Sequence, residues 1–287
     1  MNAPAGQSGR VAVVIIAAGR RDHLTRTLAH LTQQSRPADD IVVVDMDPSL
    51  PIADAVVDPA RRVSMAALGD GTGLPLAAAR NTGAAATDAE RLIFLDVDCL
   101  AAGDLVERYV EVLGAYPGTL ACGPVRYLRA GWAAGGPGVR DGPDWATLDR
   151  LSDAHPARVP PLGTSVRVGD DHELFWSLAF GCSRTTWGAL GGFDAGYRGY
   201  GAEDTDFALR ARRAGTALAW FAGGTAYHQW HEPTRGDESR IAEMVANARR
   251  FHGRWGSWPM AGWLQELHES GWVIFDPAGD RLDLVAG

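Results

Sequence analysis

The strongest constraint on the fold is a continuous run of eight apolar residues near the start of the chain, Val11 to Ala18 (VAVVIIAA). A β-branched run of this kind is typical of a strand that is buried on both faces. Two later runs have the same character, residues 41–45 (IVVVD) and residues 91–95 (RLIFL). The sheet built from these strands must therefore lie inside the molecule, with both faces covered.

Amphipathic segments between the apolar runs can provide that cover. Residues 22–34 predict a helix, because Leu24, Leu28 and Leu31 recur along one face. We expect further helices at 74–86, 103–115, 183–190 and 203–214, and short strands at 63–66 and 217–221. Strands that alternate with helices predict an α/β fold with a mostly parallel central sheet flanked by helices. Such sheets bind ligands beyond the carboxyl ends of their strands.

Two regions depart from this alternation. Residues 129–169 are dense in Gly and Pro with little periodicity, and we expect a long, partly mobile loop region that covers a site. A basic helix at about 235–254 and four late tryptophans predict a C-terminal helical extension over residues 233–287. The first ten residues are expected to be disordered, and they lack the apolar core of a signal peptide.

Charge and composition exclude several function classes. The net charge of -8, from 27 basic and 35 acidic residues, argues against a nucleic-acid binder. All basic residues are arginine, so mechanisms that need a lysine, such as Schiff-base or Walker-type phosphate chemistry, are excluded. Three scattered cysteines fit a reducing cytoplasm. No apolar run is long enough for a transmembrane segment, although peripheral membrane contact stays open.

The first candidate site is Asp96-Val97-Asp98, directly after the apolar run at 91–95. Two carboxylates one residue apart on a strand-to-loop turn can converge on one hard cation. Such a cation can bridge the two phosphates of a nucleotide sugar and neutralise the leaving diphosphate. An alternative is an ordinary surface loop or helix cap, where Asp is common. The position after a buried strand favours the metal site.

The second candidate site is the acidic stretch that contains Glu203, Asp204 and Asp206. Acids in a first helical turn are stabilised by the helix dipole, which is a purely structural explanation. Three acids in four residues exceed what capping needs. A carboxylate at this helix start could act as a general base on an acceptor hydroxyl.

The third candidate site is the pair His228 and His231. Imidazole binds divalent metals, and a loop could direct one or both rings to an ion held by Asp98. A lone histidine is more often a polar surface or core residue. We take His228 as the first candidate ligand and His231 as the second.

Several segments in this order resemble family 2 glycosyltransferases: VAVVIIAAGRRDHL, IVVVDMDPS, LAAARNTGAA and RLIFLDVDC. The later segment FWSLAFGCSRTTWGALGGFDAGYRGYGAEDTDF resembles one shared with metazoan galactosyltransferases. The resemblance implies a GT-A (Rossmann-like) fold, a UDP-sugar donor and Mn²⁺ or Mg²⁺. It also implies a nucleotide-sugar-binding half at 11–128 and an acceptor-binding, catalytic half at 129–232. Two positions depart from the pattern: Ala17-Ala18-Gly19 replaces the usual Thr-Tyr-Asn, and Met46 replaces an acid.

The same resemblance implies a role for each matching residue. On the donor side, the resemblance places Asp45 at the uracil, Arg20 near the uridine, Arg80 at the nucleotide and Asp96 at the ribose or donor sugar. It makes Asp98 a ligand of the metal, together with His228 or His231. Acceptor-site roles fall to Tyr200 against the sugars, Glu203 at the acceptor and Asp204 as the base.

These assignments predict an inverting enzyme that transfers a sugar to a hydroxyl of an unidentified acceptor, a glycan or a small molecule. One alternative is a sugar nucleotidylyltransferase, because Ala17-Ala18-Gly19-Arg20 is similar to the start of those enzymes. Those enzymes also need a downstream lysine, which this chain lacks. Another alternative is a non-catalytic sugar-nucleotide or glycan-binding protein, for which ten tryptophans would suit carbohydrate stacking.

Overall fold

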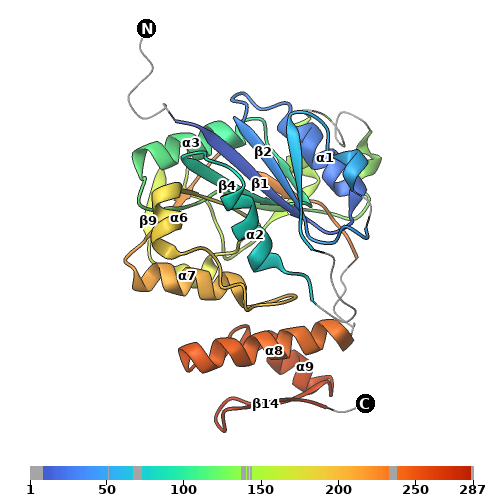
Figure 1. Cartoon of the computed structure of the whole chain (residues 1–287), viewed down its shortest axis with the longest axis vertical. Coiled ribbons are helices and arrows are strands. Elements are labelled where there is room, and N and C mark those ends of the chain that lie inside the picture. Colours follow the sequence, from blue (N-terminus) through green and yellow to red (C-terminus); the bar gives the residue numbers. More distant parts are fainter. Residues whose placement is uncertain are drawn as a thin grey trace.

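The computed structural model describes residues 9–50, 52–66, 73–136, 140, 142, 144–232 and 238–285. A sheet of eight strands runs through the molecule in the order β3-β2-β1-β4-β10-β6-β11-β9 (Figure 1). Its strands are β1 (Val11–Ala17), β2 (Asp40–Asp45), β3 (Ala60–Ser64), β4 (Arg91–Asp96), β6 (Leu120–Cys122), β9 (Val166–Gly169), β10 (Ala179–Ser183) and β11 (Leu218–Phe221). The pairings from β3 to β4 are parallel, and β10 is antiparallel to both of its neighbours.

Helices cover both faces of this sheet, as the apolar runs predict. The odd-numbered side chains of β1 (Val11, Val13, Ile15) share one apolar core with α1 (Arg21–Leu31) and α3 (Leu105–Ala115). The even-numbered side chains of β1 pack in a second core. That second core includes residues of α2 (Leu76–Ala85), α6 (Arg184–Leu190) and α7 (Glu203–Arg213). Because successive strand residues face opposite sides, one short strand is the centre of both cores.

A second, smaller sheet is joined to the first through the turn after β4. Its order is β5-β12-β7-β8, with β5 (Cys99–Ala101), β7 (Val125–Leu128), β8 (Ser152–Ala154) and β12 (Ala226–His228). Two residues, 97 and 98, separate β4 from β5. The segment with Asp98 therefore lies at the junction of the two sheets.

The region 129–169, predicted as a long loop, contains regular structure, so that prediction was wrong in part. It holds the 3₁₀ turn η2 (Trp132–Gly135), helix α5 (Trp145–Arg150), β8 and β9. These elements are short, and each strand gains its hydrogen bonds from a partner outside its own segment. Local periodicity could not reveal them. Residues 137–139, 141 and 143 of this region, like residues 1–8 at the start, lie outside the described residues.

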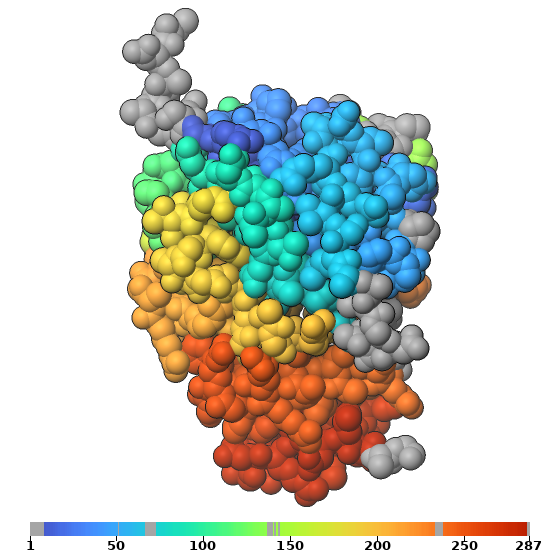
Figure 2. Space-filling model, in the orientation of Figure 1, coloured from blue at the N-terminus to red at the C-terminus, as the bar shows by residue number. Residues whose placement is uncertain are grey.

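The C-terminal extension forms a layer below the body of the molecule, orange to red in Figures 1 and 2. It contains α8 (Glu238–Trp255) and α9 (Ala261–Glu269), in line with the helical extension expected from the sequence, and also a hairpin of β13 (Val273–Asp276) and β14 (Arg281–Leu284) that was not predicted. These elements share their own apolar cluster. None of the helices in the described part of the chain is both long and apolar enough to cross a membrane.

The contact of α2 with the sheet depends on Gly83. A Cβ at this position would lie 2.2 Å from Cγ1 of Val14 and 3.1 Å from Cγ2 of Val44. We expect Gly83→Ala to lower the free energy of unfolding by about 1–3 kcal/mol, because the helix must move off the strands. Gly188→Ala is the control, since nothing lies within 4 Å of its added Cβ in α6. Urea denaturation measures both, and equal stability of the two variants would contradict the prediction.

Candidate active site

Three of the predicted metal ligands converge at the junction of the two sheets. Nε2 of His228 lies 3.6 Å from Oδ1 of Asp98, and Nε2 of His231 lies 3.6 Å from its Oδ2. One ligand atom from each residue lies within 4.8 Å of the others. The backbone holds the cluster together, because the Gln229 amide donates to the Asp98 carbonyl at 2.6 Å. A single divalent ion could contact all three side chains.

Arg20 also reaches this cluster. It precedes α1 in a left-handed conformation, and its guanidinium donates to Oδ2 of Asp98. Burial would raise the pKa of the Asp98 carboxyl, but the contact with His231 and the charges of His228 and Arg20 hold it below its usual range. Asp98 is therefore a carboxylate. His23, which we did not predict, lies on α1 with its ring 6.4 Å from that of His231.

A second cluster forms around the buried Arg80 of α2, which is only 3% exposed. Its Nη2 donates to Oδ1 of Asp96 at 2.8 Å, and its Nη1 lies 3.8 Å from Oε1 of Glu203. One guanidinium thus joins the end of β4 to the start of α7. Burial and the charge of Asp204 raise the pKa of Glu203 to about 7, and burial raises the pKa of Asp96.

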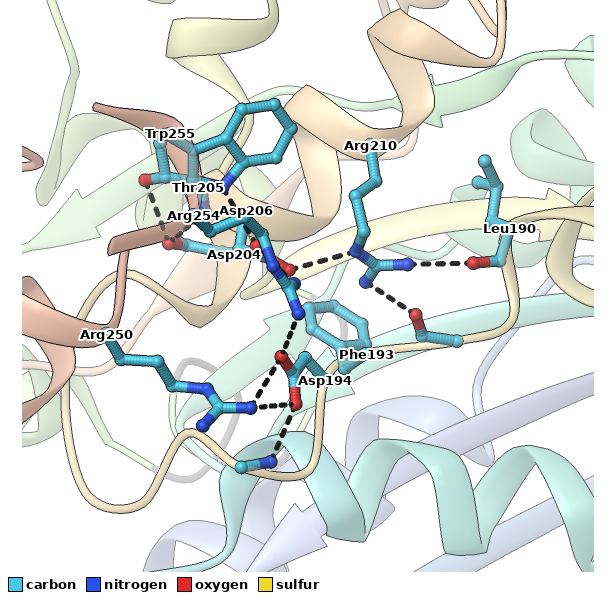
Figure 3. Close-up of polar contacts among 12 residues, drawn as sticks. Leu190, Phe193, Asp194, Asp204, Thr205, Asp206, Arg210, Arg250, Arg254 and Trp255 are labelled. Carbon is cyan, nitrogen blue, oxygen red and sulfur yellow. Dashed lines mark hydrogen bonds and ion pairs between the residues drawn. The ribbon is translucent and has the colours of Figure 1, made fainter. Parts of the chain in front are cut away.

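The three acids at the start of α7 lie in different environments. Asp206 is fully buried and accepts hydrogen bonds from Arg210 at 2.9 Å, Arg254 at 2.8 Å and Trp255 at 3.0 Å (Figure 3). Asp204 is half-buried and accepts from the amide of its neighbour Thr205 at 2.7 Å. Burial raises the pKa of Asp204. Asp206 is thus committed to structure, whereas the side chain of Asp204 is the more exposed of the two.

The loop before α7 is attached to the C-terminal extension by ion pairs. Asp194 of the GGFD segment contacts Arg250 at 2.9 Å and Arg254 at 2.8 Å, both on α8 (Figure 3). Arg254 also contacts Asp206, so one arginine connects the loop to the helix that follows it. These contacts were not predicted, because ion pairs between distant segments leave no local pattern.

Tyr200 lies where this loop meets α8 and α9. Its amide donates to Glu243 at 3.2 Å, and its ring stacks on that of Trp263 with centroids 5.8 Å apart. The guanidinium of Arg240 lies 4.8 Å from the centre of the Tyr200 ring. The aromatic residue predicted to contact sugars is therefore held by the C-terminal extension.

Asp45 stands apart from the other predicted residues. It ends β2, is fully buried and accepts from Nη1 of Arg62 at 3.0 Å. Strand β1 lies between β2 and β4, so Asp45 is about 10 Å from the end of β4. The edge that holds Asp45 and Asp96 is the carboxyl edge of the parallel strands, where such folds bind nucleotides.

The fold and the sequence together show which protein family this chain belongs to. The structure is similar to the crystal structure of GalNAc-T7 with UDP, GalNAc and Mn²⁺, with a TM-score of 0.59 and 15% identity, over 86% of this chain and 48% of that one. The predicted GT-A fold is thereby confirmed. The model of glycosyl transferase family 2 matches residues 12–161, and that of the N-terminal domain of galactosyltransferase matches residues 166–232. The chain belongs to glycosyl transferase family 2.

Two curated relatives agree with this placement. Validoxylamine A glucosyltransferase of Streptomyces hygroscopicus subsp. jinggangensis (strain 5008) is 28% identical over 259 residues, which cover 84% of this chain and 60% of the relative. Its counterpart from S. hygroscopicus subsp. limoneus is also 28% identical, over 84% of this chain and 56% of its own length. The chain thus spans rather more than half the length of the curated relatives it matches.

The raised pKa of Glu203 makes stability depend on pH. Between about pH 4.5 and 7 the folded chain keeps a proton on Glu203 that the unfolded chain releases, so the free energy of unfolding falls as pH rises. We expect Glu203→Gln to reduce this fall by about 1–3 kcal/mol between pH 5 and 8. Urea denaturation at both pH values measures it, with the exposed Glu266→Gln as control. An unchanged fall in Glu203→Gln would contradict the buried, raised-pKa carboxyl.

Proposed function

We propose that the chain catalyses the metal-dependent transfer of a sugar from a UDP-sugar to an acceptor hydroxyl, with inversion at the anomeric carbon. The observation that carries this proposal is the Asp98–His228–His231 cluster at the carboxyl edge of the sheet. Membership of the family supports it. The fold supports it as well, because GalNAc-T7, which shares this fold, was crystallised with UDP, GalNAc and Mn²⁺.

Asp98, His228 and His231 would hold the divalent ion. One carboxylate and two imidazoles favour Mn²⁺ over Mg²⁺, because Mg²⁺ prefers an all-oxygen shell. When bound, the ion would neutralise the diphosphate of the donor. The contact of Arg20 with Asp98 favours a place for its guanidinium at the diphosphate rather than the uridine. Asp45, Arg80 and Asp96 complete the proposed donor site, within residues 11–128.

Asp204 is the proposed general base. Its carboxylate takes the proton of the acceptor hydroxyl while the acceptor oxygen bonds to the anomeric carbon and UDP leaves with the electron pair of the broken bond. A raised pKa suits this role, because it strengthens the carboxylate as a base. Glu203 and Tyr200 would hold the acceptor within residues 129–232, and residues 233–287 would form the supporting extension.

The donor sugar is proposed to be a hexose, which agrees with the glucosyltransferase name of the curated relatives. The acceptor is proposed to be a glycan or a small molecule with a free hydroxyl. The cytoplasmic location expected from the cysteines stays a prediction. All three cysteines are buried and unpaired.

The metal site can be tested with UDP alone. Asp98→Ala should abolish Mn²⁺-dependent binding of UDP, because the ion loses its carboxylate ligand. Titration calorimetry with UDP, with and without Mn²⁺, measures the effect. Asp88→Ala is the matched control, since Asp88 is exposed and precedes the opposite end of β4. Unchanged UDP affinity in a folded Asp98→Ala protein would exclude the assignment.

The base can be tested by single-turnover kinetics with saturating donor and an active acceptor. Asp204→Asn should slow transfer at least ~100-fold, the scale of a lost general base, while donor affinity hardly changes. Glu203→Gln should instead raise the acceptor KM more than it slows transfer. Proton NMR of the product gives its anomeric configuration. Near-normal transfer by Asp204→Asn would place the base elsewhere, and a retained configuration would refute inversion.

A further inference from the structure

Two buried polar side chains connect the segments that carry the proposed metal ligands. Gln229 stands between His228 and His231 in the sequence, and Thr27 lies on α1. Both side chains are fully buried. A buried amide or hydroxyl destabilises the fold unless its hydrogen bonds are made inside the protein. The partners of Gln229 and Thr27 therefore indicate which parts of the chain they hold together.

The hydroxyl of Thr27 holds the peptide group that precedes Asp98. It donates a hydrogen bond to the carbonyl of Val97 at 2.8 Å. A threonine hydroxyl inside a helix can bond to the carbonyl four residues earlier, as Thr25 of α1 does with Arg21 at 3.0 Å. Thr27 instead directs its hydrogen out of the helix, to the turn between β4 and β5.

The peptide group that follows Asp98 is held from the other side. Its carbonyl accepts the 2.6 Å hydrogen bond from the backbone amide of Gln229. Because each peptide group is planar, fixing the carbonyls before and after the Asp98 Cα restricts both of its backbone torsions. Thr27 and Gln229 together thus set the direction in which the Asp98 carboxylate leaves the backbone.

The side chain of Gln229 joins the histidine segment to α1. Its Nε2 donates to the carbonyl of His23 and to Oγ1 of Thr27, each at 3.3 Å. Its Oε1 accepts from Nη1 of Arg26, also at 3.3 Å. A carbonyl only accepts and a guanidinium only donates, so these partners fix the orientation of the amide. Because the Thr27 hydroxyl accepts from Gln229 and donates to Val97, a chain of hydrogen bonds runs from one ligand segment to the other.

Apolar packing already attaches α1 to this part of the structure. Leu24 and Leu28 of the helix share an apolar cluster with Cys99 and Ala101 of β5. An apolar side chain at position 27 or 229 would extend that packing without the free-energy cost of burying polar groups. The polar network is therefore better explained by the backbone groups that it fixes, which lie beside the proposed metal ligands.

We propose that Thr27 and Gln229 are positioning residues of the metal site. They act through the backbone of the ligand segments, and they hold Asp98 and the two histidines at the spacing that one divalent ion requires. Loss of such outer-shell hydrogen bonds typically costs about 10–100-fold in metal affinity. This inference rests on the proposed function, because it uses the same three ligands.

The test measures how far Mn²⁺ strengthens the binding of UDP, by calorimetric titration of the full chain with UDP at a fixed Mn²⁺ concentration and again in EDTA. Gln229→Met should reduce this gain by about tenfold or more, because Met fills the space but makes none of the hydrogen bonds. Thr27→Val should do the same, and Thr27→Ser, which keeps the hydroxyl, should restore most of the gain. The UDP affinity in EDTA should be the same in all of these variants.

Two matched controls lose buried hydrogen bonds elsewhere in the chain. The side chain of Gln34 is buried and bonds to the backbone of Ala102 at 2.8 Å and of Val106 at 3.0 Å. The hydroxyl of Thr186, also buried, donates to the carbonyl of Pro117 at 3.0 Å. Gln34→Met and Thr186→Val should lower the Tm to a similar extent but keep the full Mn²⁺-dependent gain.

The outcomes separate the positioning role from the metal site itself. A gain that is absent from the unmodified protein, or that survives Asp98→Ala, refutes the metal site and the positioning role with it. A gain that depends on Asp98 but stays complete in Gln229→Met and Thr27→Val overturns the positioning role alone. So does an equal loss in the two controls, or a Thr27→Ser protein no better than Thr27→Val. If Gln229→Met does not fold, the comparison of Thr27→Val with Thr27→Ser decides.

Discussion

The active-site region depends on one buried guanidinium, that of Arg80. It comes from α2, which packs on β1 and β2, and it contacts the carboxyl groups of Asp96 on β4 and Glu203 on α7. Three elements far apart in the sequence are thereby fixed to one another. A buried ion pair adds little net stability, but loss of one partner is costly, on the order of 3–5 kcal/mol. The contact therefore fixes the end of β4, just before the turn that contains Asp98, relative to the start of α7.

A second set of ion pairs attaches the start of α7 to the C-terminal extension. Asp194 and Asp206 flank the loop before α7, and both contact Arg254 of α8. Asp206 is fully buried and the side chain of Arg254 is 38% exposed, so salt screens the contact between them only in part. The aromatic ring of Tyr200 in the same loop rests on Trp263 of α9. The extension is thus part of the proposed acceptor side, although its apolar cluster is its own.

The sequence predicted the elements that have a clear local pattern of apolar residues. Strands β1, β2 and β4 follow from continuous apolar runs, and the position of Asp98 after β4 follows from them. The small sheet was missed, because β5 and β12 have three residues each and are held by partners more than 100 residues away. The same holds for side chains. All 27 basic residues are arginines, so nothing local distinguishes Arg254, which contacts two carboxylates, from the other arginines. Its role depends on which carboxylates the fold brings to it.

The different environments of the three acids at the start of α7 follow from helix geometry. Successive residues of a helix point about 100° apart, so Glu203 and Asp206 face neighbouring directions while Asp204 faces another. Glu203 and Asp206 are accordingly both buried, the first near Arg80 and the second against Arg210 and α8. Their burial fixes the rotation of the helix about its axis. Asp204 is therefore held in a direction of its own by the burial of Glu203 and Asp206, and in the proposed mechanism a base so held needs no reorientation before it accepts a proton.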